Sequence, residues 1–377
     1  MSETLNFREG IRGRNRDAFI AALHDEAPLY RDRAGFWVAS RFEDVRAVLL
    51  DHASFSSGAM GGMLPLISDD PPRHSQLRGL LSKAFTPTMI EAMRPWVQSL
   101  AHDLVAAIEP SVEVEVVSAL TTPLPVTVIA RMMDIPMSDS DRFKEWSNAL
   151  VGLQDNPTEG DRMAKVAELG AYFAGVIAAR RKAPGDDLIS ALIRADEQDV
   201  ALADQEIVGF CILLLVAGNE TTTNLLGSLL HRIAKDPAAW TRLRTDPKAV
   251  EASVEEALRI DAPAQFVMRQ ATADVEIGDA RIAKGAMVMV YLAAANRDPA
   301  KWEDPANFDL ARARERHLAF GHGVHTCIGA PLARLEAQAA MAALAAKFSG
   351  VRAGAQKAQH LRSGILNGFA TLPLVFS

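Results

Sequence analysis

Cysteine, tyrosine and long apolar runs are scarce in this chain of 377 residues, which contains 2 cysteines and 3 tyrosines. Two cysteines are too few for a disulfide framework, so we expect Cys211 and Cys327 to be free thiols in a reducing compartment, the cytoplasm. The longest apolar run, residues 210–217, is far shorter than the roughly 20 residues that cross a bilayer. Residues 1–10 carry charges where a secretory signal is apolar. The sequence therefore predicts neither export nor a membrane anchor.

Positive charge is not in excess either. The chain has 40 Lys and Arg against 47 Asp and Glu, which gives a formal net charge of −7. This balance provides no general attraction to nucleic acid or to anionic membranes. Hydrophobic residues make up 49% and charged residues 23% of the chain, which is ordinary for a folded protein. Because no repeat or flexible linker divides the sequence, we expect one large domain over residues 1–377, and a monomer.

Helical patterns dominate the sequence. Apolar residues recur at helical spacing, and Asp, Ser or Pro opens many of these segments. The predicted helices are 16–25, 45–51, 71–85, 87–108, 124–134, 138–151, 162–183, 204–235, 237–246, 249–260 and 331–348. Strand signals are short and occur at 36–39 and within 268–290. The fold class predicted from these patterns is mainly α with a small β part.

A loop rich in glycine leads into the last predicted helix. From Phe320 it reads Phe-Gly-His-Gly-Val-His-Thr-Cys-Ile-Gly, and Pro331 follows at a position that suits a first helical turn. Cys327 is thus predicted at a helix N-terminus, where backbone N–H groups and the helix dipole lower the pKa of a thiol. The glycines leave space for a flat ligand to approach the sulfur. From these residues alone, Cys327 is a metal ligand, a nucleophile or a buried structural thiol.

The long predicted helix 204–235 contains the sequence Ala-Gly-Asn-Glu-Thr-Thr at 217–222. A glycine and an ionisable residue within an apolar helix both cost stability, and such local violations are typical of functional sites. Thr221 can donate a hydrogen bond to the carbonyl of Ala217, which bends a helix and opens a polar groove. Taken alone, the pattern favours a simple helix bend with a partly solvated Glu220.

Together these two motifs resemble those of the cytochrome P450 family. The pattern Phe-x-x-Gly-x-His-x-Cys-x-Gly is similar to the haem-binding loop of that family, in which a cysteine thiolate ligates the iron. The resemblance implies the P450 fold, with a long central helix over haem b (iron protoporphyrin IX). It implies that Cys327 is the metal ligand, that His325 contacts a haem propionate, and that Phe320 and Gly329 shape the site around the sulfur.

The helix motif is similar to the distal motif of the same family. The resemblance implies that Glu220 and Thr221 are catalytic and relay protons to iron-bound dioxygen. It also implies that Ala217 and Gly218 leave room above the haem. The chain departs from the family pattern at Ala203, because relatives often have Thr at this position before the helix. The difference affects helix capping and not the chemistry of the site.

Further matches to the family lie outside the two motifs. His74 and Arg78 are spaced i,i+4, which alone is compatible with a solvated helix face. The resemblance implies that they, with Arg269 and His325, pair the two haem propionates. Glu256 and Arg259 are spaced i,i+3, which alone is typical of a weak surface ion pair.

The resemblance implies that Glu256 and Arg259 are instead buried and form an ion-pair network with Arg312. Asn296 begins a further family match, Asn-Arg-Asp-Pro. If the network is buried, loss of Arg259 leaves an unpaired charge, and we expect Arg259→Ala to abolish folding with haem.

The function implied by the resemblance is that of a haem-thiolate monooxygenase, which inserts one atom of dioxygen into a small hydrophobic substrate, most simply by hydroxylation. A separate ferredoxin and ferredoxin reductase would supply two electrons, and Arg73, Lys83 and Arg334 are candidates for a basic docking patch. Family segments predict a mostly apolar substrate pocket. Its residues are Met60, Met63, Leu64, Leu214, Gln265, Val267, Ile365, Leu366 and Asn367.

Three other functions remain open at this point. A peroxide-driven peroxygenase or haem-thiolate isomerase often lacks the pair formed by Glu220 and Thr221. A haem-based gas sensor or carrier would bind a gas without turnover. In a protein without haem, Cys327 would be a nucleophile.

Overall fold

The computed structural model describes residues 10, 16–60, 64–150, 159–196, 202–312 and 315–377. The helices Leu188–Asp196 and Leu292–Ala295 were not predicted, and the other helices agree with the predicted segments to within a few residues at most ends. They are α2 (Arg16–Glu26), α3 (Phe42–Leu50), α4 (Arg73–Ser82), α5 (Pro87–Ala106), α6 (Pro123–Met132), α7 (Ser140–Leu150), α8 (Glu159–Lys182), α9 (Leu188–Asp196), α10 (Asp204–Ile233), α11 (Pro237–Thr245), α12 (Pro247–Ile260), α13 (Leu292–Ala295) and α14 (Ala330–Lys347). Short helical turns connect them at Gly58–Met60, Val117–Thr121, Met137–Asp139 and Gly323–His325.

The strands are short and form small sheets. They are β1 (Leu29–Arg31), β2 (Trp37–Ala39), β3 (Phe55–Ser56), β4 (Glu113–Glu115), β5 (Val267–Ala271), β6 (Val275–Ile277), β7 (Ala280–Ile282), β8 (Met287–Val290), β9 (Val351–Ala353), β10 (Gln359–His360), β11 (Phe369–Thr371) and β12 (Pro373–Phe376). The largest sheet has the order β1-β2-β8-β5-β3, with β2 and β8 parallel. A three-stranded sheet has the order β4-β12-β9. The predicted class, mainly α with a small β part, is confirmed.

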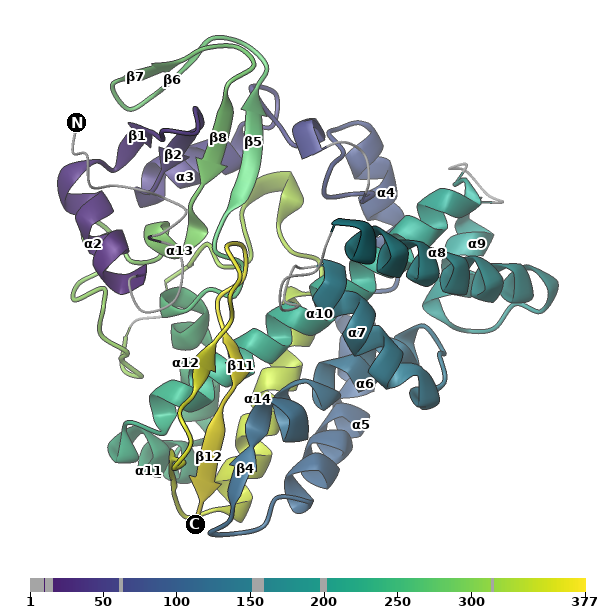
Figure 1. Ribbon diagram of the computed structural model, residues 1–377, viewed down its shortest axis with the longest axis vertical. Coiled ribbons are helices and arrows are strands. Elements are labelled where there is room, and N and C mark those ends of the chain that lie inside the picture. The colour runs from purple at the N-terminus through teal and green to yellow at the C-terminus, as the bar shows by residue number, and fades with distance from the viewer. Residues whose placement is uncertain (1–9, 11–15, 61–63, 151–158, 197–201, 313–314) are drawn as a thin grey trace.

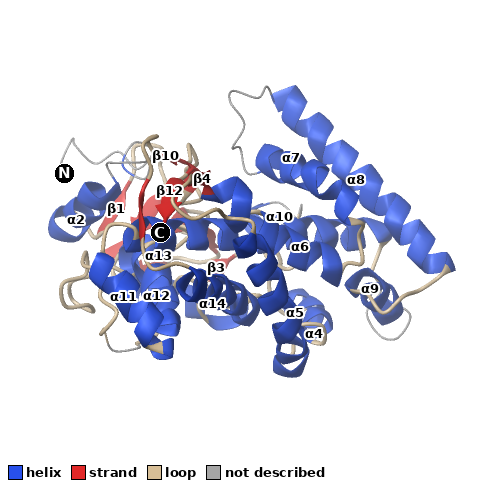
Figure 2. Ribbon diagram, turned by 90° about the horizontal axis from the view of Figure 1, so that it is seen from below, coloured by secondary structure: helices blue, strands red, loops and turns tan. Residues whose placement is uncertain are grey.

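Strands and helices are segregated in space. The sheet containing β1, β2, β5 and β8 lies beside α2 and α3, while α7, α8 and α9 lie at the opposite side of the molecule (Figure 1). Seen from below, the strands lie in one half of the molecule together with α2, α11 and α12, and the other half is helical (Figure 2). The chain thus brings the N-terminal strands β1 to β3 into one sheet with β5 and β8, which follow more than half a chain later.

Helix α10 crosses the centre of the molecule between these two sides (Figure 1). At 1.5 Å per residue its 30 residues extend over about 45 Å. It packs against α6, α8, α12 and α14. Among the described residues α10 alone is long and apolar enough to cross a membrane, and 67% of its most apolar window is buried within the protein.

The start of α10 shows how the helix accommodates Ala203. This residue is the N-cap and has no side-chain hydrogen bond to offer. Glu206 Oε2 instead accepts a hydrogen bond of 2.9 Å from the Ala203 N–H, which is half of a capping box. Asp204 and Glu206 also place negative charge near the positive end of the helix dipole. The helix is therefore capped without the expected threonine.

Candidate active site

The loop before α14 holds Cys327 by its backbone. The Cys327 N–H donates a hydrogen bond of 2.9 Å to the Phe320 carbonyl, and α14 begins three residues later. Gly321 and Gly323 have φ values of +68° and +71°, which side-chain-bearing residues rarely adopt. A Cβ atom on Gly323 would lie 2.6 Å from the carbonyl oxygen of Leu49, so this glycine allows the loop to pack closely on α3.

Both cysteines are free thiols, as predicted, and their surroundings differ. Cys211 is buried within α10, whereas Cys327 is accessible at its site. The prediction of a lowered pKa for Cys327 is wrong for the protein without a bound ligand. Although the sulfur is accessible, the protein atoms packed around it desolvate the thiol and raise its pKa. The N–H groups of Gly329 and Ala330 and the positive charges of Arg78 and Arg334 oppose that effect. A metal ion would reverse the balance, because coordination deprotonates a thiol outright.

The four basic residues expected at the propionates lie in one cluster. The rings of His74 and His325 are 4.2 Å apart. His325 Nε2 lies 3.1 Å from the hydroxyl of Ser57. Burial, with repulsion from Arg269 and His74, lowers the pKa of His325 to about 3. Burial also lowers the pKa of His74, Arg78 and Arg269. The cluster is therefore poor in negative charge.

Two observations show that this cluster fits an anionic group. His74 is 1% exposed, and neither of its ring nitrogens has a hydrogen-bond partner among the described residues. Asp69 and Asp70 favour protonation of His74, and Asp70 also favours the charged forms of Arg269 and His325. The oxygens of Asp70 already accept bonds from Ser56 Oγ and the Ser57 N–H. A ligand with two carboxylates, such as haem, would supply the missing partners.

The helix motif presents a small open face. Ala217 and Gly218 are exposed and Thr221 is half-buried, while the next residues of α10 are buried. Thr221 Oγ1 donates a hydrogen bond of 2.6 Å to the Ala217 carbonyl, as predicted. The helix nevertheless continues without a break from Asp204 to Ile233. The absence of large side chains at Ala217 and Gly218 leaves room for a flat ligand.

Glu220 points away from that face and toward α7. Its side chain is 2% exposed, and its Oε1 accepts hydrogen bonds from Lys144 Nζ at 3.0 Å and Ser147 Oγ at 2.8 Å. The Lys144 side chain is 29% exposed, so it links the buried carboxylate to the protein surface. Neither partner could be predicted, because a pattern within one helix does not identify a residue on another helix.

The predicted ion-pair network around Glu256 is present. Arg259 Nη2 and Nε each lie 2.8 Å from a Glu256 oxygen, and Arg312 Nε lies 3.1 Å from Oε1. Arg259 also donates to the carbonyls of Asn296, Pro305 and Asn307. The network therefore fastens the coil before the cysteine loop to α12.

The residues proposed for the substrate pocket have mixed positions. Met63 and the side chain of Met60 lie outside the described residues. The C-terminal turn contacts the segment before β5, where the Gln265 N–H donates a hydrogen bond of 2.9 Å to the Ile365 carbonyl. Ile365 is 55% exposed, while the other members are wholly or partly buried. These buried or partly buried members are Leu64, Leu214, Gln265, Val267, Leu366 and Asn367.

The expected docking patch carries less free charge than the sequence suggested. Arg73 forms an ion pair with Glu206, and Arg334 forms one with Glu255. Lys83 is exposed. Two of these three cations are thus balanced by carboxylates, and docking at this surface stays a prediction.

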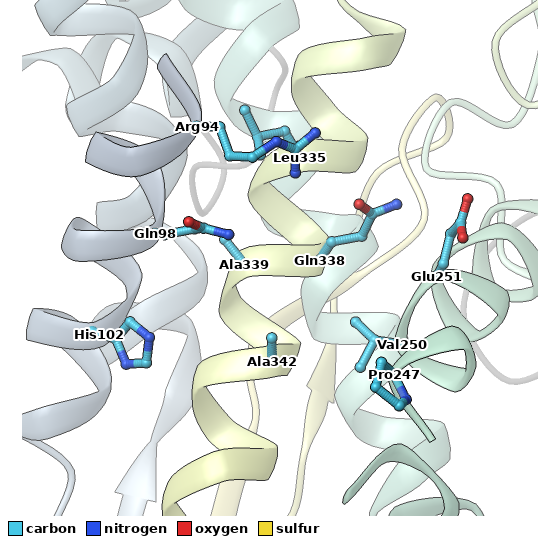
Figure 3. A pocket seen from close by; sticks show the side chains of 10 residues that line it. All are labelled: Arg94, Gln98, His102, Pro247, Val250, Glu251, Leu335, Gln338, Ala339 and Ala342. Carbon is cyan, nitrogen blue, oxygen red and sulfur yellow. The ribbon is translucent and has the colours of Figure 1, made fainter. Parts of the chain in front are cut away.

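A separate cleft of about 430 Å³ lies between α5, α12 and α14. Figure 3 shows its lining side chains on these three helices. They are Arg94, Gln98, His102, Pro247, Val250, Glu251, Leu335, Gln338, Ala339 and Ala342. None of them is among the predicted site residues, and the cleft contains no cysteine, so it is distinct from the site at Cys327.

Comparison with known proteins agrees with this geometry. The cytochrome P450 family model matches residues 153–367. Erythromycin C-12 hydroxylase of Saccharopolyspora erythraea is 39% identical over 346 residues, which cover 88% of this chain and 86% of that enzyme. The structure of cytochrome P450 CYP109Q5 from Chondromyces apiculatus is 36% identical, with a TM-score of 0.89, and the match covers 99% of this chain and 98% of that one.

A third relative is the crystal structure of CYP109E1 from Bacillus megaterium in complex with testosterone. It is 33% identical, has a TM-score of 0.88, and covers 97% of this chain and 98% of that one. The accessible cysteine at the start of α14, the basic cluster beside it and the small-residue face of α10 fit the cofactor of this family, haem b. The chain belongs to the cytochrome P450 family, and it is a haem-dependent monooxygenase.

Proposed function

We propose that this enzyme hydroxylates a hydrophobic small molecule, using dioxygen and two electrons from a separate ferredoxin and ferredoxin reductase. We further propose that it acts as a cytoplasmic monomer. The observation that carries the proposal is the accessible sulfur of Cys327 beside four basic side chains, of which His74 and Arg269 are buried and the other two partly buried. When bound there, haem iron would activate dioxygen, with Cys327 as its thiolate ligand.

The chain's own residues would have separate tasks around that group. His74, Arg78, Arg269 and His325 would pair the two propionates. Each of these side chains has a pKa lowered by burial, so a pair of carboxylates would restore the charge balance that the protein lacks.

Proton supply is the proposed task of Glu220 and Thr221. The Thr221 hydroxyl donates its own hydrogen to Ala217, which leaves lone pairs on Oγ1 that can accept a proton. The ammonium group of Lys144 is 3.0 Å from Glu220 Oε1 and partly exposed, so it can pass a proton to the carboxylate and take up another from solvent. This arrangement supports an oxygen-activating monooxygenase over a peroxygenase, which needs no such supply.

The substrate is proposed to be a bulky, mostly apolar compound. Support comes from the apolar character of the proposed pocket residues. It also comes from the names of two relatives, an erythromycin hydroxylase and an enzyme solved in complex with testosterone.

The first experiment is a spectrum of the reduced holoenzyme with carbon monoxide. We expect the thiolate type of spectrum in the wild type and in Cys211→Ala, which removes the buried thiol, and its loss in Cys327→Ala. An imidazole-type spectrum, or a protein that takes up no haem, would contradict the role of Cys327.

The second experiment separates the possible activities. Hydrophobic compounds are first screened for the optical spin-state change that follows displacement of an iron-bound water. NADH consumption with supplied ferredoxin and reductase is then compared with product formed. We expect both to depend on the two electron carriers. Turnover with hydrogen peroxide alone would indicate a peroxygenase, and gas binding without NADH consumption would indicate a sensor.

A further inference from the structure

We propose that Arg334 and Glu255 form a charge-balanced clamp that sets the reduction potential of the haem iron through the Cys327 loop. The inference rests on the proposed role of Cys327 as the iron ligand. Arg334 acts here as a positioning residue, because its contacts are to Phe320 of the loop and to Glu255.

The guanidinium of Arg334 makes two kinds of contact at once. Its carbon atom lies 4.6 Å from the centre of the Phe320 ring. Its Nε and Nη2 donate hydrogen bonds of 2.6 Å and 2.9 Å to the two oxygens of Glu255. Stacking on a ring while binding a carboxylate with two parallel hydrogen bonds requires a flat, forked cation, and arginine alone among the side chains provides it.

The clamp acts on the cysteine through Phe320. The Phe320 carbonyl accepts the hydrogen bond from the Cys327 N–H, so a contact that fixes Phe320 also fixes the backbone at the sulfur. Glu255 is on α12 and Arg334 is in the second turn of α14. The clamp therefore joins these two helices across the loop that carries the proposed ligand.

A third side chain keeps the carboxylate ionised. His317 Nδ1 accepts a hydrogen bond from the Ala319 N–H, so its Nε2 carries the ring hydrogen and donates to Glu255 Oε2 at 3.2 Å. Burial opposes ionisation of Glu255, yet the bonds from His317 and Arg334 lower its pKa to about 2. At neutral pH the clamp thus contains one positive and one negative charge.

Charge balance matters because the clamp lies against the loop that holds the proposed iron ligand. The guanidinium of Arg334 stacks on Phe320, whose carbonyl accepts the hydrogen bond from the Cys327 N–H. Reduction adds a negative charge to the iron site, and an added positive charge nearby favours the reduced state. Loss of the Glu255 charge alone would raise the reduction potential of the iron, and loss of the Arg334 charge alone would lower it. When both charges are lost, the two effects would largely cancel.

The test is redox titration of the holoenzyme and of three variants. We expect Glu255→Gln to shift the midpoint potential upward, Arg334→Gln to shift it downward, and the double variant to return close to the wild type. Glu251→Gln serves as a control, since Glu251 is an exposed carboxylate on the same helix. We expect it to leave the potential unchanged. A purely structural role would shift both single variants in one direction or neither, and would overturn the proposal.

A conservative variant tests the stacking contact. Arg334→Lys keeps the charge and loses the flat fork, so we expect a potential near that of the wild type but faster loss of the thiolate-type carbon monoxide spectrum. A potential as low as that of Arg334→Gln would contradict the electrostatic role. The wild-type spectrum separates the role of Cys327 from that of the clamp. A spectrum that is not of the thiolate type contradicts Cys327 as the iron ligand. A normal spectrum with unshifted potentials in the variants contradicts only the clamp.

Discussion

Two arginines in this protein form the same ion pair in opposite surroundings. Arg259 and Arg94 each bind, through two hydrogen bonds, a glutamate three residues earlier. The Arg259 and Glu256 side chains are 2% and 5% exposed, whereas those of Arg94 and Glu91 are 38% and 61% exposed. Spacing in the sequence is identical, so the difference between the pairs lies in burial and in the three backbone carbonyls that Arg259 also binds.

We expect Arg259→Ala to lower the free energy of unfolding by roughly 3 to 5 kcal/mol, because it leaves the Glu256 carboxylate buried without its main partner. Arg94→Ala is the matched control, and its effect should lie within the measurement error because water replaces the lost contact. Denaturant unfolding measures both. Equal effects would show that burial is not the deciding factor.

Thr221→Ala tests proton supply. We expect haem binding and the carbon monoxide spectrum to persist, while a larger share of NADH oxidation yields hydrogen peroxide instead of product. Thr221→Ser should restore coupling, because it keeps the hydroxyl. Thr241→Ala is the control, since Thr241 makes the same kind of hydrogen bond, 3.0 Å to the carbonyl of Pro237, on a helix away from the site. Full coupling in Thr221→Ala would contradict the assigned role.

At the scale of elements, the contact between the cysteine loop and α3 depends on Gly323. Its φ of +71° and the 2.6 Å approach to Leu49 leave no space for a Cβ atom. We expect Gly323→Ala to cost roughly 2 kcal/mol or more of unfolding free energy, and to weaken haem retention. Gly79→Ala is the control, because a Cβ there meets nothing within 4 Å and α4 should gain up to about 1 kcal/mol. Thermal unfolding of both variants measures these changes in stability.

Helices could be predicted from the sequence because their signals are local. Capping residues mark the start of α11, where Asp236 accepts hydrogen bonds from two backbone N–H groups and Pro237 follows. The short strands could not be predicted in the same way. Strand β12 pairs with β4, which lies more than 250 residues earlier, and its apolar residues have no periodicity that identifies that partner.

In the candidate site, too, residues in local motifs could be predicted and contacts between distant segments could not. Cys327 and Thr221 lie in motifs whose spacing is read within one segment. The ion pair of Glu220 with Lys144 joins α10 to α7 across 76 residues, and the balance of Arg334 by Glu255 joins α14 to α12 across 79. These contacts arise from packing, which no single segment encodes. The net pKa of Cys327 escaped prediction for the same reason, because burial is a property of the whole fold.

Viewed as a whole, the molecule contains histidines whose burial makes its stability sensitive to acid. His231 on α10 packs against Phe369, and burial, with repulsion from Lys235 and His360, lowers its pKa to about 4. In the unfolded chain the pKa is near the ordinary 6.5. The unfolded state therefore binds more protons between these values, and stability falls as the pH drops from about 6.5 toward 4.

We expect His231→Gln to reduce the loss of unfolding free energy between pH 7 and pH 5, measured by denaturant unfolding. His102→Gln serves as a control, because His102 is exposed on α5. If both variants retain the wild-type dependence on pH, the partly buried ring of His231 is not the source of the sensitivity.

The unequal exposure of the two thiols offers a way to count molecules that lack cofactor. Cys211 is 0% exposed, so an alkylating reagent should reach only the sulfur in the loop. Iron at that sulfur would shield it, and mass spectrometry of briefly treated protein should then show one adduct on each empty molecule and none on each filled one. The ratio of the two masses would report cofactor occupancy without any optical measurement.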